Sequence, residues 1–393
     1  MKKSVRDIEV SNKRVLVRVD FNVPIKEGKI TSTIRVDEAL NTVQYLLDNN
    51  ARVILCSHLG RPDGKRDEKY TLKPVYEYLK KCLPTVNVKF CDDCVGEEAE
   101  KMSKELKNGE VLLLENLRYH AEEEANDEDF CKKLARLADV YVNDAFGTAH
   151  RKHASTYGVA KLLPNSCGLL MAKELESFEV LNDAKRPFVA ILGGAKIGDK
   201  IEVTKNLLQK VDVLLIGGGM CYTFLKSIKM EVGKSLVDDS QLDFCYNVMK
   251  EAIEKKVKIV LPIDFVCSTS IEDTENVVIC KLGQIPENYM ALDIGPKTRK
   301  LFNKYIKRAK TIVWNGPMGV YEVECFSHGT EEVAKSVAKN KRCFSIIGGG
   351  DVVSAVEQFD LSSKISHIST GGGASLKLLE GKELAGVSVL ENK

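Results

Sequence analysis

Glycine runs in the second half of the chain carry the pattern most suggestive of chemistry. Each lies between a short lead-in and a segment of helical pattern, in FVAILGGAKIGDK (188–200), VLLIGGGMCYTFL (213–225), FSIIGGGD (344–351) and ISTGGGASLKLL (368–379). Glycine lets backbone N–H groups approach a ligand, and a following helix N-terminus favours negative charge. A single run would be ambiguous, because a strand-to-helix turn also needs glycine. Together the four runs predict a phosphate-lined nucleotide site.

Charged side chains stand within two of these runs. Asp351 ends FSIIGGGD, where it is either a helix N-cap or a ligand of Mg²⁺ bound between the protein and substrate phosphates. Lys196 and Lys200 are four residues apart, and they would share a face if their segment were helical. Both lysines then either form a solvent-exposed face or bind phosphate oxygens, and the adjacent glycines favour the second interpretation.

The first half of the chain concentrates arginine at the expected ends of strands. An isolated arginine is more often a surface charge than a ligand. In a parallel sheet, however, the carboxyl ends of strands meet, so these residues predict a basic pocket for a small polyanion. His58 is either a structural histidine or a donor to that anion. The residues are Asp20 and Asn22 in RVDFNVP (18–24), Arg35 at an expected helix start, His58 and Arg61 in SHLGRP (57–62), Arg118 in LLLENLRYH (112–120) and Arg151 in NDAFGTAHRKH (143–153).

Familiar phosphate, dinucleotide and metal motifs are incomplete. EVGKS (231–235) resembles the end of a P-loop, but Ile228 occupies the position of its first glycine. The chain has no GxGxxG, which weakens a dinucleotide-binding interpretation. Cys91 and Cys94 form a lone CxxC in FCDDCVG, and no second pair accompanies it, so zinc or redox chemistry there is a minor alternative.

Strand-like apolar runs alternate with amphipathic segments along the whole chain. Near-continuous Val, Ile and Leu in the strands predict parallel sheets covered on both faces, and hence two doubly wound α/β domains in tandem. Pro164, Gly168 and Pro187 flank LLMAKELESFEVL, whose helical period predicts a stiff hinge helix. Expected strands are 14–21, 51–60, 86–93, 110–118, 140–147, 187–194, 211–219, 257–265, 310–317 and 342–351, and expected helices include 37–50 and 127–139.

Composition narrows the class of protein. The 393 residues carry a net charge of +2, with 44% hydrophobic and 29% charged residues, which does not favour a nucleic-acid binder. The N-terminus lacks the apolar stretch of a secretion signal, and no apolar run is long enough to cross a membrane. We therefore expect a cytoplasmic protein with reduced thiols and no nucleic-acid or membrane partner. The absence of a coiled-coil pattern favours a monomer.

The ordered set of motifs resembles the phosphoglycerate kinase family across nearly the whole chain. The resemblance rests on RVDFNVP, SHLGRP, LLLENLRYH, NDAFGTAHR, GGAKIGDK, WNGPMGVYE, GGGD and STGGGASL. Departures are small: Ile197–Gly198 replaces a common Val–Ser, Tyr321 a frequent Phe, and His328 a common Lys. The resemblance implies two Rossmann-like domains: 1–165 binding 3-phosphoglycerate and 186–376 binding MgATP or MgADP. It also implies a hinge at 166–185 and a segment, 377–393, returning to the first domain.

Residue roles follow from the same resemblance. It implies reversible phosphoryl transfer from ATP to the carboxylate of 3-phosphoglycerate, with hinge closure and no general base. Arg35, Lys196 and Lys200 would be catalytic, and Asp351 would bind Mg²⁺. The acidic substrate would be held by Asp20, Asn22, Arg35, His58, Arg61, Arg118 and Arg151, and the nucleotide by Lys196, Lys200, Asn315, Glu322, Gly348, Gly349, Gly350, Asp351 and Thr370.

Two other classes of protein share parts of this pattern. A nucleotide-dependent dehydrogenase has the same fold class, but it needs GxGxxG and a ribose-binding acid. A binder of nucleotides or sugar phosphates without catalytic activity would not need Lys200 or Asp351, and both are present. Binding of NADH would favour the first alternative, and binding of ligands without turnover would favour the second.

Overall fold

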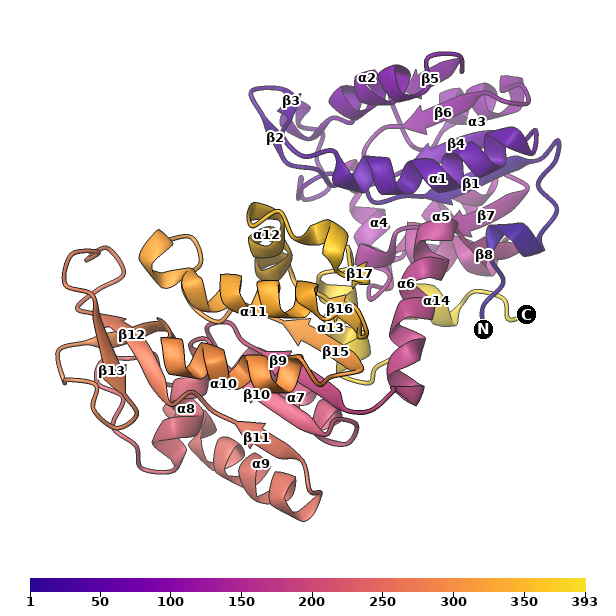
Figure 1. Ribbon diagram of the computed structural model, residues 1–393. Helices are drawn as coiled ribbons and strands as arrows, with labels where there is room; N and C mark the ends of the chain where they lie inside the picture. The colour runs from indigo at the N-terminus through magenta and orange to yellow at the C-terminus, as the bar shows by residue number, and fades with distance from the viewer. The chain divides into compact units, whose positions relative to one another are not determined.

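The computed structural model describes residues 1–393, which form two compact units (Figure 1). Unit 1 consists of Met1–Glu176 and Glu383–Lys393, and unit 2 consists of Ser177–Lys382. The division falls within helix α6 (Leu169–Glu179). Each unit contains a six-stranded sheet in which every pairing is parallel. The predicted α/β class with doubly wound parallel sheets is therefore confirmed.

The sheet of unit 1 has its first strand near the middle. Strands β1 and β4 pair so that Arg18 lies opposite Cys56, and β1 also pairs with β7, opposite Asn143. The core strands are apolar throughout because helices cover both faces. The order across the sheet is β5 (Val88–Cys91), β6 (Val111–Leu114), β4 (Arg52–Cys56), β1 (Arg14–Arg18), β7 (Val140–Asn143) and β8 (Asn165–Cys167).

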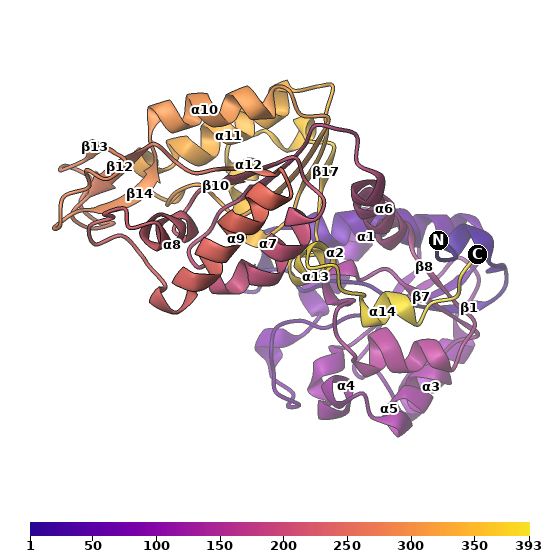
Figure 2. The same ribbon diagram turned by 90° about the horizontal axis from the view of Figure 1, so that it is seen from below.

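The helices of unit 1 pack on both faces of its sheet. Alternate strand residues such as Val15, Val53 and Val111 share one apolar cluster with Val43 of α1 and Leu79 of α2. Figure 2 shows α3 and α5 on the opposite side from α1. The helices are α1 (Ile34–Asp48), α2 (Lys73–Cys82), α3 (Glu97–Glu105), α4 (Ala121–Ala125), α5 (Glu128–Ala135) and α14 (Ala385–Ser388).

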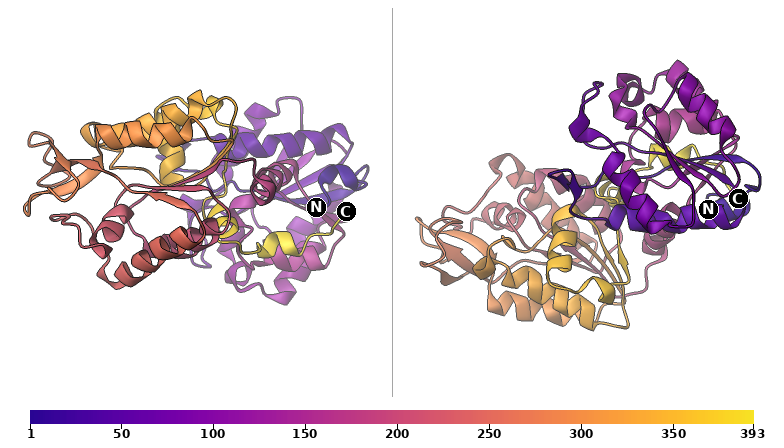
Figure 3. Two further views of the ribbon diagram at one scale, coloured as in Figure 1. Left: turned by 60° about the horizontal axis from the view of Figure 1, so that its bottom comes forward. Right: turned by 90° about the horizontal axis from the view of Figure 1, so that it is seen from above.

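The two ends of the chain lie side by side in unit 1 (Figure 3). The Lys393 N–H donates to the carbonyl of Met1 at 3.2 Å, and the Lys3 ammonium pairs with Glu391 at 2.7 Å. Farther in, the Gly386 N–H donates to the carbonyl of Ala149 at 2.7 Å. The last residues of the chain are therefore hydrogen-bonded to the loop that follows β7.

The main sheet of unit 2 repeats this construction. Its apolar face packs against α10, α11 and α12, through residues that include Trp314, Phe302 and Val337. Figure 2 shows α7 and α9 on the other side. The order across the sheet is β11 (Lys258–Val260), β10 (Val213–Ile216), β9 (Phe188–Leu192), β15 (Thr311–Asn315), β16 (Phe344–Ile347) and β17 (His367–Ile368). The helices of unit 2 are α7 (Ile201–Leu208), α8 (Met220–Ser227), α9 (Leu242–Glu254), α10 (Pro296–Ile306), α11 (His328–Lys339), α12 (Gly350–Gln358) and α13 (Gly373–Leu379).

Two small antiparallel elements were not predicted. The expected strand 257–265 is wrong as a single element, because it divides at Pro262 into β11 and β12 (Asp264–Ser268). Proline has no N–H to give to a sheet ladder. Strand β12 pairs with β13 (Val278–Lys281) and β14 (Met290–Ile294) in a separate sheet, and β2 (Ile25–Lys26) pairs with β3 (Lys29–Ile30). No helix in the structure is both long and apolar enough to span a bilayer.

One carboxylate joins the two outermost strands at one edge of the unit 1 sheet. Glu110, just before β6, accepts from the Lys89 ammonium of β5 at 2.7 Å, from the Asn87 amide at 2.7 Å and from the Lys107 N–H at 2.9 Å. Burial acts to raise the pKa of Glu110, but these three donors outweigh it and lower the pKa to about 2.

The Glu110→Gln variant should therefore lose stability in a pH-dependent way. The pKa of Glu110 is depressed in the folded state. The stability that the ionised carboxylate contributes is therefore full above a pH of about 4.5 and is lost as the pH falls toward about 2. We expect a loss of about 1 kcal/mol of unfolding free energy at pH 7. The difference from wild type should shrink below pH 4.5 in urea titrations. Glu105→Gln is the control, because Glu105 is an exposed carboxylate in α3. An equal loss of unfolding free energy in this variant would contradict the role given to Glu110.

Candidate active site

The carboxyl ends of β1 and β4 bring the first group of predicted site residues together. Arg35, in the first turn of α1, donates to the carbonyl of Asn22 at 2.9 Å and lies 3.4 Å from the Asp20 carboxylate. The Asn22 side chain accepts from the Gly60 N–H at 2.9 Å, and the Arg118 guanidinium donates to the Gly60 carbonyl at 2.8 Å. Asp20, Asn22, Arg35 and Arg118 thus form one hydrogen-bonded network through the backbone of Gly60.

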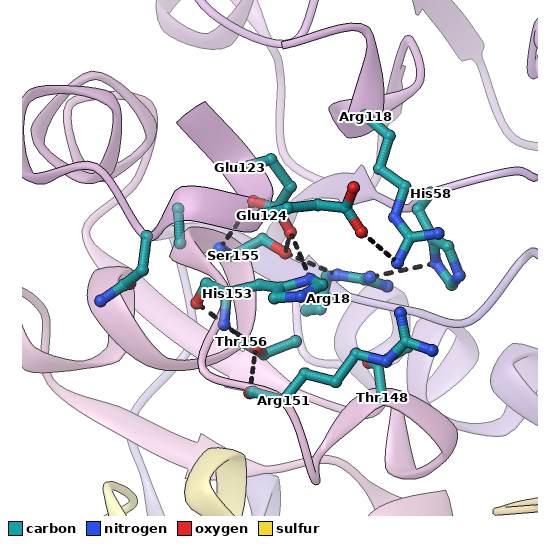
Figure 4. Close-up of polar contacts among 12 residues, drawn as sticks. Arg18, His58, Arg118, Glu123, Glu124, Thr148, Arg151, His153, Ser155 and Thr156 are labelled. Carbon is teal, nitrogen blue, oxygen red and sulfur yellow. Dashed lines mark hydrogen bonds and ion pairs between the residues drawn. The ribbon is translucent and has the colours of Figure 1, made fainter. Parts of the chain in front are cut away.

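Behind this network lies a buried relay that the sequence analysis missed (Figure 4). Arg18, the last residue of β1, is 1% exposed. Its Nη2 lies 3.2 Å from His58 Nδ1, and its Nε donates to Ser155 Oγ at 2.8 Å. Ser155 donates in turn to the fully buried Glu123, from its hydroxyl at 2.6 Å and from its N–H at 2.9 Å. We call Glu123, Ser155, Arg18 and His58 the unit 1 relay.

Positive charge dominates the surroundings of His58. Burial, followed by the nearby guanidinium groups of Arg18, Arg118, Arg151 and Arg35, holds the pKa of His58 well below its ordinary value. The imidazole is therefore neutral near pH 7. Because Arg18 can only donate, Nδ1 must accept, and the single imidazole proton resides on Nε2. His58 thus offers an N–H donor without adding a charge.

Of the two remaining predicted residues of unit 1, only Arg151 lies close to this cluster. The Arg151 Nε donates to His150 Nε2 at 3.3 Å, and Arg151 is close enough to Arg118 to lower its pKa. Burial is the larger cause of that lowering, while Glu124, 2.8 Å from the Arg118 guanidinium, opposes it. Arg61 is exposed, and the structure does not connect it to the others.

Unit 2 gathers a second group where β15 and β16 end. The Lys200 ammonium donates to the Asn315 side chain, and the Asn315 amide donates to the Gly348 carbonyl at 2.5 Å. Burial lowers the pKa of Lys200, while the charges of Asp199 and Asp351 oppose that shift. Lys200, Asn315 and Gly348 are therefore brought together, with Asp351 close enough to act on the ammonium.

The glycine runs differ in what surrounds them. A side chain on Gly218 would meet the backbone of Gly194 at 2.6 Å, and one on Gly316 would meet that of Gly193 at 2.4 Å. The first two runs are therefore explained by tight contact between loops. By contrast, a side chain on Gly350 would meet nothing within 4 Å. The loop after β16 is therefore open at Gly350, whereas side chains on Gly348 and Gly349 would meet Ser375 and Asn315. An open backbone position is what a backbone anion site requires.

Two sequence interpretations change at these loops. Asp351 is not the N-cap of α12, because Gly349 holds that position, with φ +113°, and the exposed Asp351 follows in the first turn. The premise that Lys196 and Lys200 share a helix face is wrong. The helix α7 begins only at Ile201, and Lys196 lies in an exposed loop before the short turn Gly198–Lys200.

The other nucleotide candidates flank this region. Glu322 is exposed in the turn after Tyr321, and Thr370 is half-buried in the loop between β17 and α13. Glu322 makes no hydrogen bond or ion pair with Lys200 or Asn315. Sequence reasoning did not single out Arg18, Glu123 or Ser155. Arg18 alone gave a signal, as a charge at the end of β1 between the apolar residues Val17 and Val19.

Comparison with known proteins points to a single family. The family model for phosphoglycerate kinase matches residues 5–382. A phosphoglycerate kinase of Dictyoglomus turgidum is 52% identical over 390 residues, covering 99% of this chain and 98% of that protein. One from Moorella thermoacetica is 53% identical over 393 residues, covering all of both chains.

A solved structure shares the fold as well as the sequence. The phosphoglycerate kinase from Coxiella burnetii superposes with a TM-score of 0.91 at 38% identity, covering 99% of this chain and 98% of that one. The match therefore spans both units, including the loops that carry the two groups of polar residues. The resemblance predicted from the motifs is confirmed, and the chain belongs to the phosphoglycerate kinase family.

Proposed function

We propose that the protein catalyses reversible phosphoryl transfer between ATP and the carboxylate of 3-phosphoglycerate, giving ADP and 1,3-bisphosphoglycerate, a step of glycolysis and gluconeogenesis. The main support is the convergence of Arg18, Arg35, Arg118 and Arg151 around His58 in a chain that matches its family in both units. A small molecule with a phosphate and a carboxylate suits such a cluster. The loop of Gly348, Gly349 and Gly350 in unit 2, which is open at Gly350, suits the nucleotide phosphates.

The reaction needs little from acid–base chemistry. The acceptor carboxylate is already ionised near pH 7, so no residue has to remove a proton from it. Catalysis then consists of positioning two anions in line and neutralising the transferring group. We assign that neutralisation to Arg35, Lys196 and Lys200. In unit 1, Asp20, Asn22, His58, Arg61, Arg118 and Arg151 hold the substrate.

The nucleotide residues of unit 2 fit a magnesium complex. Asp351 is exposed at an open glycine loop and has no capping role, so its oxygens are available to a hard cation. When bound, Mg²⁺ would shield charge on the phosphate oxygens. Asn315 keeps Lys200 in place, and Glu322 and Thr370 complete the proposed nucleotide contacts.

The two substrates must meet, although their proposed donors belong to different units. We propose that α6 and the residues around it act as a hinge, and that closure excludes water that would hydrolyse the acyl phosphate. Small-angle scattering should show a smaller radius of gyration with 3-phosphoglycerate and MgADP together than with either alone. An unchanged radius in the ternary complex would contradict closure.

Asp351→Ala tests the magnesium assignment and the activity together. Turnover of ATP and 3-phosphoglycerate can be coupled to NADH oxidation by glyceraldehyde-3-phosphate dehydrogenase. We expect kcat to fall on the order of 10²-fold, because a transition-state charge contact is lost. Glu357→Ala, an exposed carboxylate at the other end of α12, should retain wild-type turnover. Absence of turnover in folded wild type would contradict the proposed function.

Ser155→Ala tests the unit 1 relay. The variant keeps every charge but removes the oxygen that accepts from Arg18 Nε, so Arg18 and His58 lose their fixed orientation. We expect KM for 3-phosphoglycerate to rise about tenfold, equivalent to about 1.4 kcal/mol, with KM for ATP unchanged. ¹⁵N NMR of His58 should show a smaller fraction of the Nε2–H tautomer.

A buried serine in the same unit supplies the control for this experiment. Ser103 in α3 donates to the Glu100 carbonyl at 2.8 Å, away from the relay. Ser103→Ala should leave both KM values and the tautomer unchanged. If Ser155→Ala raised KM for both substrates equally, the effect would be a general loss of stability instead of the loss of a positioning residue.

A further inference from the structure

One cluster of metal-ligating side chains lies outside the residues used above. Asp93 and Cys94 follow β5, and His120 follows the short turn Leu117–Tyr119 that succeeds β6. Because β5 and β6 pair in parallel, their carboxyl ends meet. His120 Nε2 lies 2.7 Å from Asp93 Oδ1, and one ligand atom from each of the three residues lies within 4.8 Å of the other two.

We propose that Asp93, Cys94 and His120 form a three-ligand Zn²⁺ site, with water in the fourth position. One thiolate, one imidazole and one carboxylate form a donor set suited to this borderline ion. Usual zinc–ligand bonds of about 2.0–2.3 Å place tetrahedral ligand atoms about 3.3–3.6 Å apart. The Asp93–His120 contact would therefore open by less than about 1 Å, while the thiol moves toward the pair.

Neighbouring groups already orient the three ligands. The Cys94 N–H donates to Asp93 Oδ1 at 2.6 Å and ties the carboxylate to the thiol-bearing residue. The His120 ring packs on Phe130, with ring centroids 5.3 Å apart, which restricts its rotation. Such contacts around a metal ligand commonly fix its orientation and raise metal affinity.

The exposure of the three side chains and the charge around them also suit a bound cation. The side chains of Asp93 and His120 are 48% and 28% exposed, so an ion can enter from solvent while Cys94 forms the buried floor. Glu122 adds negative charge close to His120, which Lys133 partly offsets. An ordinary cysteine thiol has a pKa of about 8.5, so without metal it is mostly protonated near pH 7.

Zinc binding therefore exchanges a proton for the metal. The Zn–S bond replaces the S–H bond of Cys94 and releases one proton. No electron is transferred. The alternative is that Asp93 and His120 are only an ion pair and Cys94 only an apolar core residue.

Cobalt titration of the full chain distinguishes these cases. Chelator-treated protein should develop a near-ultraviolet thiolate-to-Co²⁺ absorption with one equivalent of Co²⁺, and Zn²⁺ should abolish it. Excess Mg²⁺ should not compete, because this hard cation prefers oxygen ligands. Proton release on Zn²⁺ binding should be measurable in weak buffer.

Variants at the cluster and beside it make the test specific. Cys94→Ser should abolish the absorption, and His120→Gln should weaken Zn²⁺ binding at least about tenfold. Cys91→Ser is the matched control: this other cysteine of the CxxC is buried but lies outside the cluster, so its loss should leave binding unchanged. If Cys94→Ser does not fold, His120→Gln decides, because its side chain is partly exposed. Absence of the absorption in wild type, or its persistence in Cys94→Ser, would overturn the proposal.

Discussion

Parallel strand pairing determines where the polar loops of both candidate groups lie. Strands that run in one direction place all their carboxyl ends at a single edge, so loops far apart in the sequence become neighbours. In unit 1, Arg18 is in register with Cys56 and Asn143, and His58 follows only two residues after Cys56. In unit 2, the Gly348 N–H donates to the carbonyl of Trp314 at 3.0 Å, which places the open glycine loop beside Asn315.

Gathering like charges at one edge is unfavourable unless the structure compensates for it. Unit 1 does so with Glu123, a fully buried carboxylate whose pKa is raised by burial and lowered by Arg18 and by Ser155. Buried charges need hydrogen bonds and a nearby opposite charge, and Arg18 donates to Ser155, which links it to the Glu123 carboxylate. Arg118 has a more exposed partner in Glu124. The deepest guanidinium of the cluster therefore has a carboxylate behind it, linked through one hydroxyl group.

Sequence patterns predicted most of the fold because burial on both faces leaves a clear apolar signature in strands such as Val111–Leu114. The same patterns failed at 257–265, because this run is also largely apolar and only Pro262 indicates that it divides between two sheets. The candidate site was predicted as far as its residues stand in recognisable loop motifs. Glu123 and Ser155 could not be identified this way, because an acid in EEE and a serine in HAST resemble surface residues until tertiary structure buries them.

The path of the chain through unit 1 has a consequence for synthesis. Unit 1 is built from two stretches of sequence, and the whole of unit 2 lies between them. All of unit 2 is therefore made before Gly386 can receive the hydrogen bond of Asn143 and donate its own to Ala149. A ribosome making this protein carries a unit 1 that lacks its final contacts while unit 2 is already complete. The first domain to be synthesised is thus the last to be finished.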